Sequence, residues 1–404
     1  MATVEVSLSE EELQALMRGD RGLRELMTSA YNEVLEAEMT EHLGAEPNER
    51  TEEREGYRNG HYTRSLVTRV GPLTLRVPRA RDGSFSTKVF QRYQRSEKAL
   101  VLALMEMMVN GVSTRKVKRI TEKLCGREFS SSTVSRLAKG LDEQVEAWNE
   151  RPLEGRRYPF VLVDAMHIKV RRQGAVRSTS ALIAVGVNEA GYREILGIRI
   201  ANSETEEGWL ETFRWLKARG LEGVELVVSD AHDGLVEALR RCFQGATWQR
   251  CQTHFRRNIL DKTPAEWKDA MQEGLDRVFE AEDPASAREH FEELAGRLEG
   301  EADAALDTLE AGLEDAIAVL RLPAKYRRRL RTTNALERLI QELRRREKVI
   351  RIFPNDESAW RLLGAFLAET HEDWSTGRRY FRMDDYFRWR RQQKAAGEDI
   401  QPAA

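Results

Sequence analysis

The sequence predicts an α/β protein in which a mixed β-sheet carries helices on both faces. Apolar runs typical of buried strands recur between residues 156 and 250, and helical patterns separate the later ones, in the order βββαβαβα. The stretch 264–320, by contrast, contains helical patterns alone, which indicates an all-helical insertion. Upstream of the sheet, residues 8–147 predict a separate region of helices and short strands.

The composition is that of a globular chain without a disulfide framework. Of 404 residues, 41% are hydrophobic and 33% charged, and three are cysteines. The first residues are acidic and lack the apolar segment of a secretory signal, and the apolar run Ala99–Met105 is too short to span a bilayer. We therefore expect a cytoplasmic protein that does not enter a membrane.

The net charge of −2 hides a strong segregation of charge. Residues 1–56 hold 5 Lys/Arg against 15 Asp/Glu, whereas residues 57–139 hold 18 against 5. Residues 262–320 hold 5 against 17, and residues 321–351 hold 12 against 3. Solvated charged helices can carry such runs, but two basic blocks on one chain favour a bound polyanion.

The first 85 residues predict a helix, a linker and a pair of strands. Residues 8–43 have apolar residues at helical intervals, and the polar stretch 45–56 reads as a linker. In residues 57–85 apolar and polar side chains alternate, and Gly71-Pro72 and Asp82-Gly83 are typical of turns. The exposed face of these strands would be rich in arginine. Its members are Arg64, Arg69, Arg76, Arg79 and Arg81.

Residues 113–141 have the layout of a helix-turn-helix. A first helix from Ser113 to Cys125 would be followed by a turn at Gly126 and a second helix capped by Ser130 or Ser131. Any two-helix hairpin can produce this pattern, but the basic context favours a DNA-binding motif. The outward-facing residues of the second helix would read DNA. They are Ser132, Thr133, Ser135, Arg136 and Lys139.

Five strands are expected between residues 156 and 250. The first covers 156–172, two more lie within 179–201, the fourth is Val224–Val228, and a short fifth strand precedes the helix that contains THFRRN. A capping box from Ser203 to Glu206 predicts the start of the helix after the third strand.

The remaining residues predict helices. The acidic insertion is followed by a long helix at 332–351 and another at 356–374. We therefore divide the chain into five parts: an acidic N-terminal helical region, a basic DNA-binding region, the first part of the sheet domain, the all-helical insertion, and the rest of the sheet domain with the C-terminal helices. The corresponding ranges are 1–56, 57–150, 151–262, 263–325 and 326–404.

Two of the predicted strands each carry one carboxylate. Asp164 interrupts the apolar run FVLVDAM, and Asp230 ends the run ELVVSD. An ionised carboxylate in a buried strand is costly without a partner, and a cation such as Mg²⁺ is one such partner. A single aspartate of this kind is better explained as a cap for a neighbouring turn, but two in one sheet favour a site.

A third acid, Glu337, lies on the long helix. Asn334 three residues earlier fits a capping box, which would give Glu337 a purely structural role. Arg344, however, follows seven residues later on the same helical stripe. This spacing would bring a carboxylate and a guanidinium group together over a phosphate.

Specific motifs run through nearly the whole chain. They are YRNGHYTR, VGPLTLRVPRAR and VSTRKV in the N-terminal part, then VLVDAMHIKVR, VVSDAHDG, CQTHFRRN and TTNALERLIQELRRREKVIRIFPNDESAWRLLGA. Together they resemble a bacterial insertion-sequence transposase of the Mutator-like type. The resemblance implies a ribonuclease-H-like sheet interrupted by the helical insertion. It implies that Asp164, Asp230 and Glu337 are the catalytic acids, with Arg344 as the basic residue that follows the glutamate.

The implied chemistry depends on two Mg²⁺ ions, for which Mn²⁺ could substitute. Held about 3.5–4 Å apart by the three acids, such ions activate a water molecule and stabilise the leaving oxygen of a phosphodiester. The product would be a free 3′-hydroxyl at a transposon end, which then attacks a second phosphodiester. No serine or tyrosine lies in a constellation that would make it a protein nucleophile.

Four further residues have open roles. Cys251 and His254 match the family's Cys-x-x-His pair, and a zinc site would need four ligands, for which only Cys242 and His232 lie nearby. We favour His254 near the scissile phosphate and Cys251 in the core. His167 faces either the site or the core. Trp248 either packs in the core or stacks on an unpaired base.

The expected partners are double-stranded DNA, both the terminal inverted repeats and the target, and a second copy of the chain in a homodimer. No small-molecule substrate is expected. One alternative is a helix-turn-helix regulator derived from a transposase that has lost catalysis. Another is a ribonuclease-H-type nuclease that acts on RNA hybrids. The intact acids oppose the first alternative, and the long basic N-terminal region opposes the second.

Overall fold

The chain forms two compact units, Met1–Gly140 and Leu141–Ala404. The computed structural model describes residues 20–49, 51, 54–68, 71–87, 89, 104, 107, 112, 114–125 and 141–395. The helix at 142–149 therefore belongs to the second unit, together with the sheet.

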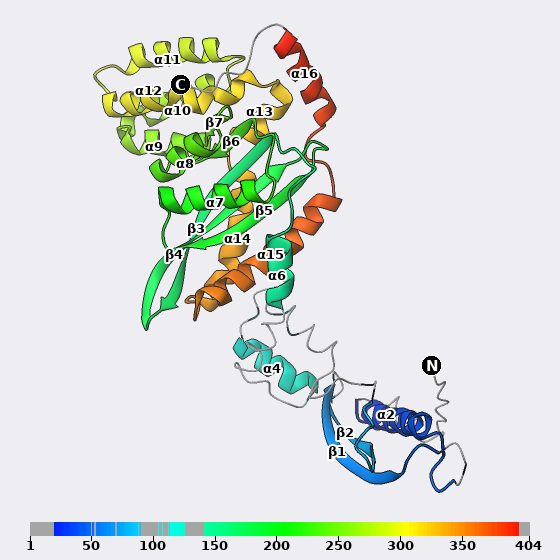
Figure 1. Cartoon of the computed structure of the whole chain (residues 1–404). Coiled ribbons are helices and arrows are strands. Elements are labelled where there is room, and N and C mark those ends of the chain that lie inside the picture. The colour runs from blue at the N-terminus through cyan, green and yellow to red at the C-terminus, as the bar shows by residue number, and fades with distance from the viewer. Residues whose placement is uncertain are drawn as a thin grey trace. The chain divides into compact units, whose positions relative to one another are not determined.

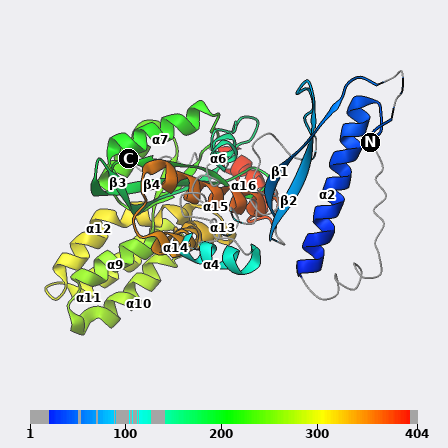
Figure 2. The same ribbon diagram turned by 90° about the horizontal axis from the view of Figure 1, so that it is seen from below.

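In the first unit a long helix packs on a β-hairpin. Helix α2 (Asp20–Leu43) lies along the antiparallel strands β1 (Arg58–Thr68) and β2 (Gly71–Ala80), as Figure 2 shows. The alternation predicted for β2 is confirmed, since its apolar side chains are buried while Thr74 and Arg76 are exposed. The acidic helix thus buries its apolar stripe within its own unit. The shared core contains Leu35, Leu66, Leu73, Leu75 and Val77.

The hairpin presents a basic surface. Arg76, Arg79 and Arg81 are exposed as expected, and the guanidinium group of Arg79 lies 4.9 Å from the ring centroid of Tyr62. Arg64 is half-buried.

Helix α4 (Thr114–Cys125) confirms the first helix of the expected helix-turn-helix. Its Val117 is fully buried, as an inward-facing position requires. The residues expected to read DNA lie outside the described residues, so the complete motif stays a prediction. These residues are Ser132, Thr133, Ser135, Arg136 and Lys139.

The second unit is built on a five-stranded mixed sheet of order β5-β4-β3-β6-β7. β3, β4 and β5 are antiparallel neighbours, whereas β6 and β7 run parallel to β3. This arrangement confirms the predicted α/β class and mixed sheet. The strands are Phe160–Arg172, Ala175–Val187, Arg193–Ala201, Leu226–Ser229 and Thr247–Arg250.

Helices cover both faces of the sheet, as predicted (Figure 1). Along β3, Phe160, Leu162 and Met166 face one side, while Val161 and Val163 face the other. Helices α7 (Glu206–Ala218) and α8 (Asp233–Cys242) pack on the second side. Helices α14 (Asn334–Ile350) and α15 (Asp356–Thr376) pack on the first side.

The predicted capping box at the start of α7 is wrong. The N-cap is Thr205, whose extended backbone lets its hydroxyl accept a hydrogen bond from the Gly208 backbone N–H at 3.3 Å. Ser203 lies two residues too early to bond that group. Since SETEE offers two hydroxyl residues before an acidic pair, the sequence pattern fits either position.

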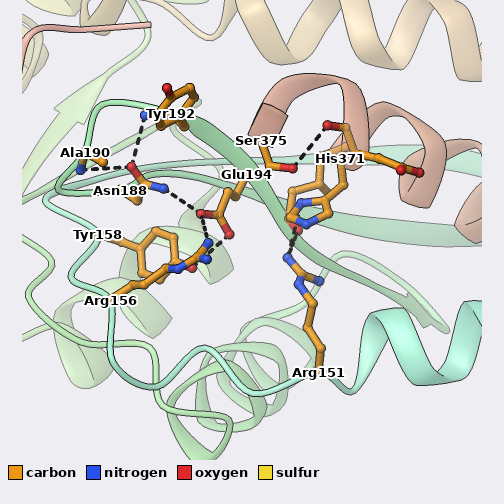
Figure 3. A network of polar contacts seen from close by, with 11 residues as sticks. Arg151, Arg156, Tyr158, Asn188, Ala190, Tyr192, Glu194, His371 and Ser375 are labelled. Carbon is orange, nitrogen blue, oxygen red and sulfur yellow. Dashed lines mark hydrogen bonds and ion pairs between the residues drawn. The ribbon is translucent and has the colours of Figure 1, made fainter. Parts of the chain in front are cut away.

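The buried carboxylate of Glu194 connects the segment before β3 with the ends of β4 and β5, and Figure 3 shows this network. Glu194 of β5 accepts hydrogen bonds from Arg156 Nη1 at 2.7 Å, Tyr158 Oη at 3.1 Å and Asn188 Nδ2 at 2.6 Å. Burial would raise the pKa of Glu194, but these three donors together lower it. Glu194 therefore keeps its negative charge in the interior, since both carboxylate oxygens accept hydrogen bonds.

The predicted insertion is helical throughout and joins the sheet through buried amides. After β7 and helix α9 (Gln252–Lys262), the chain forms three long helices and two short 3₁₀ turns that pack together (Figure 1). The side chains of Gln249 and Gln252 both donate to the backbone carbonyl of Ala316, at 2.8 Å each. The elements are η2 (Ala265–Trp267), α10 (Lys268–Phe279), α11 (Pro284–Leu298), α12 (Asp303–Ile317) and η3 (Ala318–Arg321).

The last part of the chain returns to the sheet. Helix α13 (Ala324–Leu330) leads into α14, and the segment after α14 bonds to β3, where Phe353 N–H donates to the Lys169 carbonyl at 2.8 Å. Helix α15 packs on α6 (Asp142–Asn149), and α16 (Met383–Ala395) follows it. Within the described ranges, none of these helices is both long and apolar enough to cross a bilayer.

Candidate active site

Strand register brings the first two acids together. β3 and β6 run parallel, and Leu162 pairs with Val228. Asp164 and Asp230 each follow this pair by two residues, on strands that lie about 4.8 Å apart. β6 is wholly buried over its four residues, and Asp230 lies just beyond its carboxyl end. The buried strand therefore carries its terminal carboxylate to the side of Asp164.

The first acid is strongly perturbed by this setting. Burial, followed by the nearby charge of Asp230, raises the pKa of Asp164 to about 7. The Ala165 backbone N–H, which donates to Asp164 Oδ1 at 2.8 Å, and the charge of His254 oppose this rise. Near neutral pH the Asp164 carboxyl group is therefore protonated in part of the molecules.

Glu337 enters from α14. The alternative of a capping box that starts at Asn334 is wrong, because the N-cap is Thr333 and its side chain makes no capping hydrogen bond. The Glu337 carboxylate is therefore not used to cap the helix. Its Oε1 lies 3.8 Å from His254 Nε2 and accepts a long 3.4 Å hydrogen bond from Thr333 Oγ1. Both Glu337 and His254 are partly exposed, so the group is open to a substrate.

His254 and Cys251 form the polar pair beside Glu337. The pKa of His254 is raised to about 9, mainly by its interaction with the Cys251 side chain. Burial opposes this rise, and the charges of Glu337 and Asp230 add to it. Burial would raise the pKa of Cys251, but His254 and Thr333 together lower it. Cys251 is fully buried, and its sulfur accepts hydrogen bonds from Thr333 N–H at 3.4 Å and from Thr333 Oγ1 at 3.3 Å.

Two further ionisable residues, Glu204 and His232, lie near Asp230, and no pattern in the sequence points to Glu204. It precedes α7, and its Oε2 lies 3.8 Å from His167 Nε2. His232 is the N-cap of α8, and its Nδ1 is buried without a hydrogen-bond partner within the described residues. Burial raises the pKa of Glu204; His232 opposes the rise, and Asp230 adds to it. The starts of α7 and α8 lie close together, since a Cβ on Gly234 would lie 2.5 Å from the Glu206 nitrogen.

The donor set suits a divalent cation. Asp230 Oδ1 is buried and has no hydrogen-bond partner among the described residues, and two crowded carboxylates leave negative charge uncompensated. Mg²⁺ prefers such oxygen ligands. Within the described residues, however, the Glu337 carboxylate groups with Cys251 and His254 and not with the two aspartates. In the described part of the chain, the metal-ligating atoms that lie within 4.8 Å of one another are those of Cys251, His254 and Glu337. That mixed set would suit a borderline cation such as Zn²⁺, and the acids would suit Mg²⁺.

The comparison with known proteins decides the family. The model of the family described as "Transposase, Mutator family" matches residues 1–377. The chain belongs to the Mutator family of transposases. The family places the chain among the DNA-processing enzymes and confirms the resemblance stated from the motifs.

Curated relatives agree with this assignment over most of their length. The Mutator-family chain is 48% identical to the transposase of insertion sequence ISRM5 from Rhizobium meliloti, over 92% of this chain and 93% of that one. It is 44% identical to the IS256 transposase of Tn4001 from Staphylococcus aureus, over 95% of this chain and 100% of that one. It is 39% identical to the IS1081 transposase of Mycobacterium tuberculosis, over 90% of this chain and 88% of that one.

Three other candidate residues, Arg344, Trp248 and His167, lie on α14, β7 and β3. Arg344 is exposed on α14, two turns beyond Glu337, which corresponds to about 10 Å along the helix axis. Trp248 packs in the core on the α7–α8 side of the sheet, and its Nε1 donates to Ser229 Oγ at 2.9 Å. His167 is exposed on the same side, next to Glu204.

Proposed function

We propose that this chain is the transposase of an insertion sequence, which binds the terminal inverted repeats and cuts and joins DNA strands through a 3′-hydroxyl. The observation that carries the proposal is the register of β3 and β6, which makes Asp164 and Asp230 neighbours in a partly buried, negatively charged setting. The proximity of Glu337 to His254, whose pKa both Asp230 and Glu337 raise, supports it further.

We assign the sheet to the ribonuclease-H-like class within this proposal. Three antiparallel strands followed by two parallel ones, with helices on both faces, support the assignment. In such a sheet, the end of β6 and the middle of β3 are the positions where carboxylates meet. The helix that carries Glu337 packs against β3 and completes the arrangement.

Asp164, Asp230 and Glu337 would hold two Mg²⁺ ions, or Mn²⁺ in their place. When bound, these ions lower the pKa of an attacking water and stabilise the leaving oxygen of the phosphodiester. Asp164 contributes by giving up its proton, which its pKa of about 7 permits near neutral pH. His254 is protonated below a pH of about 9, so its Nε2–H adds a positive charge beside Glu337 where a phosphate would lie.

The residues around the acids support a mechanism without a covalent protein–DNA intermediate. The Ser229 hydroxyl donates to the Asp230 carbonyl and accepts from Trp248. The Cys251 thiol is fully buried. Neither group is therefore positioned as a nucleophile, which supports attack on the phosphodiester by water or by a DNA hydroxyl.

The first unit would bind the inverted repeats. The exposed arginines of β2 and the turn after it would neutralise phosphates, and the predicted second helix of residues 130–139 would read the bases. Since both ends of an element and a target must be handled together, we propose a homodimer on DNA.

Strand cleavage tests the proposal. Purified protein is incubated with Mg²⁺ and a duplex that carries the flanking inverted repeat, and the broken phosphates are mapped. We expect nicks with free 3′-hydroxyl groups at the repeat boundary. Asp164→Asn, Asp230→Asn and Glu337→Gln should each abolish them while repeat binding persists. Binding by the wild type without cleavage would support the regulator instead, and preferential cutting of an RNA hybrid would support a ribonuclease.

A further inference from the structure

A large basic cleft lies along the start of α14, the helix that carries Glu337, and has no part in the chemistry proposed above. Its volume is about 1250 Å³, more than the roughly 300–1,000 Å³ of small-ligand pockets. It is lined by α13, by the first turns of α14, by one side of α15 and by the segment 378–382 before α16. All these elements belong to the second unit.

The charge of the cleft is strongly positive and unbalanced. Within the described residues, no carboxylate forms an ion pair with any of seven arginines that line the cleft. Its acidic lining residues already have partners, since Asp385 pairs with Lys325 and Glu342 with Arg345 and Arg346. Arg329 and Arg379 donate hydrogen bonds to the Tyr380 carbonyl and the Tyr192 hydroxyl, but all seven guanidinium groups lack a carboxylate partner among the described residues. They are Arg193, Arg328, Arg329, Arg338, Arg378, Arg379 and Arg382.

Aromatic rings hold two of these cations in place. The guanidinium carbon of Arg193 lies 4.0 Å from the ring centroid of Trp374 and 4.6 Å from that of Tyr380. Arg329 lies 4.7 Å from the centroid of Tyr380 and donates a hydrogen bond to the Tyr380 carbonyl. Burial, together with the nearby charges of Arg329 and Arg338, lowers the pKa of Arg193. The rings therefore order a crowded set of positive charges, which an anion would relieve.

The cleft extends to the start of α14, the helix that carries Glu337. Asn334 and Arg338 line it, and Glu337 lies between them on the same helix. Asn334 also lines a smaller cleft of about 380 Å³, together with Thr253 and Arg256 on the His254 side. The Thr253 hydroxyl donates to Asn334 Oδ1 at 3.3 Å. A chain that followed both clefts would therefore pass within one helical turn of Glu337.

We propose that this cleft, built from α13, α14, α15 and residues 378–382, binds the sugar–phosphate backbone of the DNA that enters the acidic site. The inference rests on the function proposed above. Guanidinium forks match phosphate oxygens, and unpaired arginines along an extended cleft suit a polymer of phosphates. Arg193 covers one face of Trp374 and one face of Tyr380, which favours recognition of the backbone over stacking on bases. The contacts of the cleft are independent of sequence.

Salt-dependent binding of the full-length protein tests this proposal. The variant Arg338→Ala/Arg378→Ala/Arg382→Ala removes three exposed cleft arginines. The matched control, Arg277→Ala/Arg288→Ala/Arg297→Ala, removes three arginines from α10 and α11 of the acidic insertion. Affinity for a labelled duplex with the inverted repeat and its flank is measured in EDTA at several salt concentrations. Each lost phosphate contact should lower the slope of log K against log salt by about 0.9.

We expect the slope of the cleft variant to fall by about two to three, and that of the control variant to stay at the wild-type value. The footprint should shrink beside the cleavage point and persist inside the repeat. Replacing the same three arginines by lysine should restore most of the slope, which a folding defect would not allow. The proposal is wrong if the alanine variant keeps the wild-type slope, if the control loses as much, or if only binding of an RNA duplex weakens.

Because EDTA prevents metal-dependent cleavage, the outcome is independent of the chemistry. A lowered slope in a protein that cannot cut DNA would support the cleft and refute the proposed function. Normal cutting with an unchanged slope would refute the cleft alone.

Discussion

Asp164 and Asp230 lie side by side because each follows the Leu162–Val228 pair of the parallel strands β3 and β6 by two residues. The backbone ladder ends at this pair, and Asp230 lies just beyond the last residue of β6. Burial and Asp230 together raise the pKa of Asp164 to about 7. The fold therefore maintains an unfavourable pair of charges, which predicts measurable effects on stability and metal binding.

Without metal, Asp164→Asn should stabilise the protein at alkaline pH. The pKa of Asp164 rises from 3.8 to about 7 on folding, so stability from this group is fully present below pH 4 and is lost as the pH rises through 7. The full shift corresponds to at most roughly 4 kcal/mol. We expect the variant to gain about 1–3 kcal/mol at pH 8 and little at pH 4.5. Urea unfolding in EDTA measures this, with the exposed Asp307→Asn as control; equal curves at pH 8 would contradict it.

Mg²⁺ binding should weaken as the pH falls below 7. A proton on Asp164 competes with the cation, so the affinity should fall by up to about tenfold per pH unit below the pKa. Thermal unfolding with increasing Mg²⁺ at pH 6 and pH 8 measures the effect. Asp164→Asn should remove both the stabilisation and its pH dependence. A wild-type midpoint that Mg²⁺ leaves unchanged at pH 8 would argue against a site at these acids.

Cys251→Ala should lower the pKa of His254. The Cys251 side chain is the main cause that raises this pKa to about 9, so its removal should return the value toward the ordinary 6.5. NMR titration of the ring, assigned with His254→Gln, measures the shift. Cleavage should then decline at a lower pH than in the wild type, because the imidazolium charge is lost earlier as the pH rises. A pKa that remains near 9 would mean that Glu337 and Asp230 suffice to raise it.

Glu204→Gln should move the acidic limb of the cleavage profile to lower pH. The charge of Glu204 contributes to the raised pKa of Asp164, although less than burial and Asp230. Its removal should therefore let Asp164 ionise at lower pH. His167→Gln serves as the control, because it removes the neighbour of Glu204 and keeps the carboxylate. If both variants gave the wild-type profile, Glu204 would be electrostatically remote from Asp164.

The parts of the site that the sequence predicted are those that local patterns reveal. Asp164 and Asp230 stand out because each interrupts or ends an apolar run, and β-strand alternation then fixes the face on which Asp164 lies. Glu204 gave no such signal, since it lies in a polar loop and meets the acids only through tertiary packing of α7 and α8. The two N-caps that the sequence suggested, Ser203 and Asn334, each lie one or two positions from the observed N-cap, which is Thr205 in α7 and Thr333 in α14.

The sequence also predicted only part of the basic cleft. The charge of residues 321–351 predicted a bound polyanion, and Arg328, Arg329 and Arg338 come from that block. Arg193 lies more than a hundred residues earlier, on the edge strand β5. Trp374, which holds it, belongs to α15. Only the packing of α15 on β5 brings these residues together, and no short-range pattern in the sequence encodes that contact.

Glu194→Ala should destabilise the second unit without changing the acids. The carboxylate is buried and accepts hydrogen bonds from Arg156, Tyr158 and Asn188. Removing it leaves buried donors unpaired, which costs about 3–5 kcal/mol. Arg156→Ala should cost under about 1 kcal/mol, because that side chain is 59% exposed and water can replace it at the carboxylate. Urea unfolding compares the two variants. Since Glu194 lies outside the proposed site, folded Glu194→Ala protein should cleave DNA at the wild-type rate at 20 °C. A selective loss of cleavage would instead connect this network to the acids.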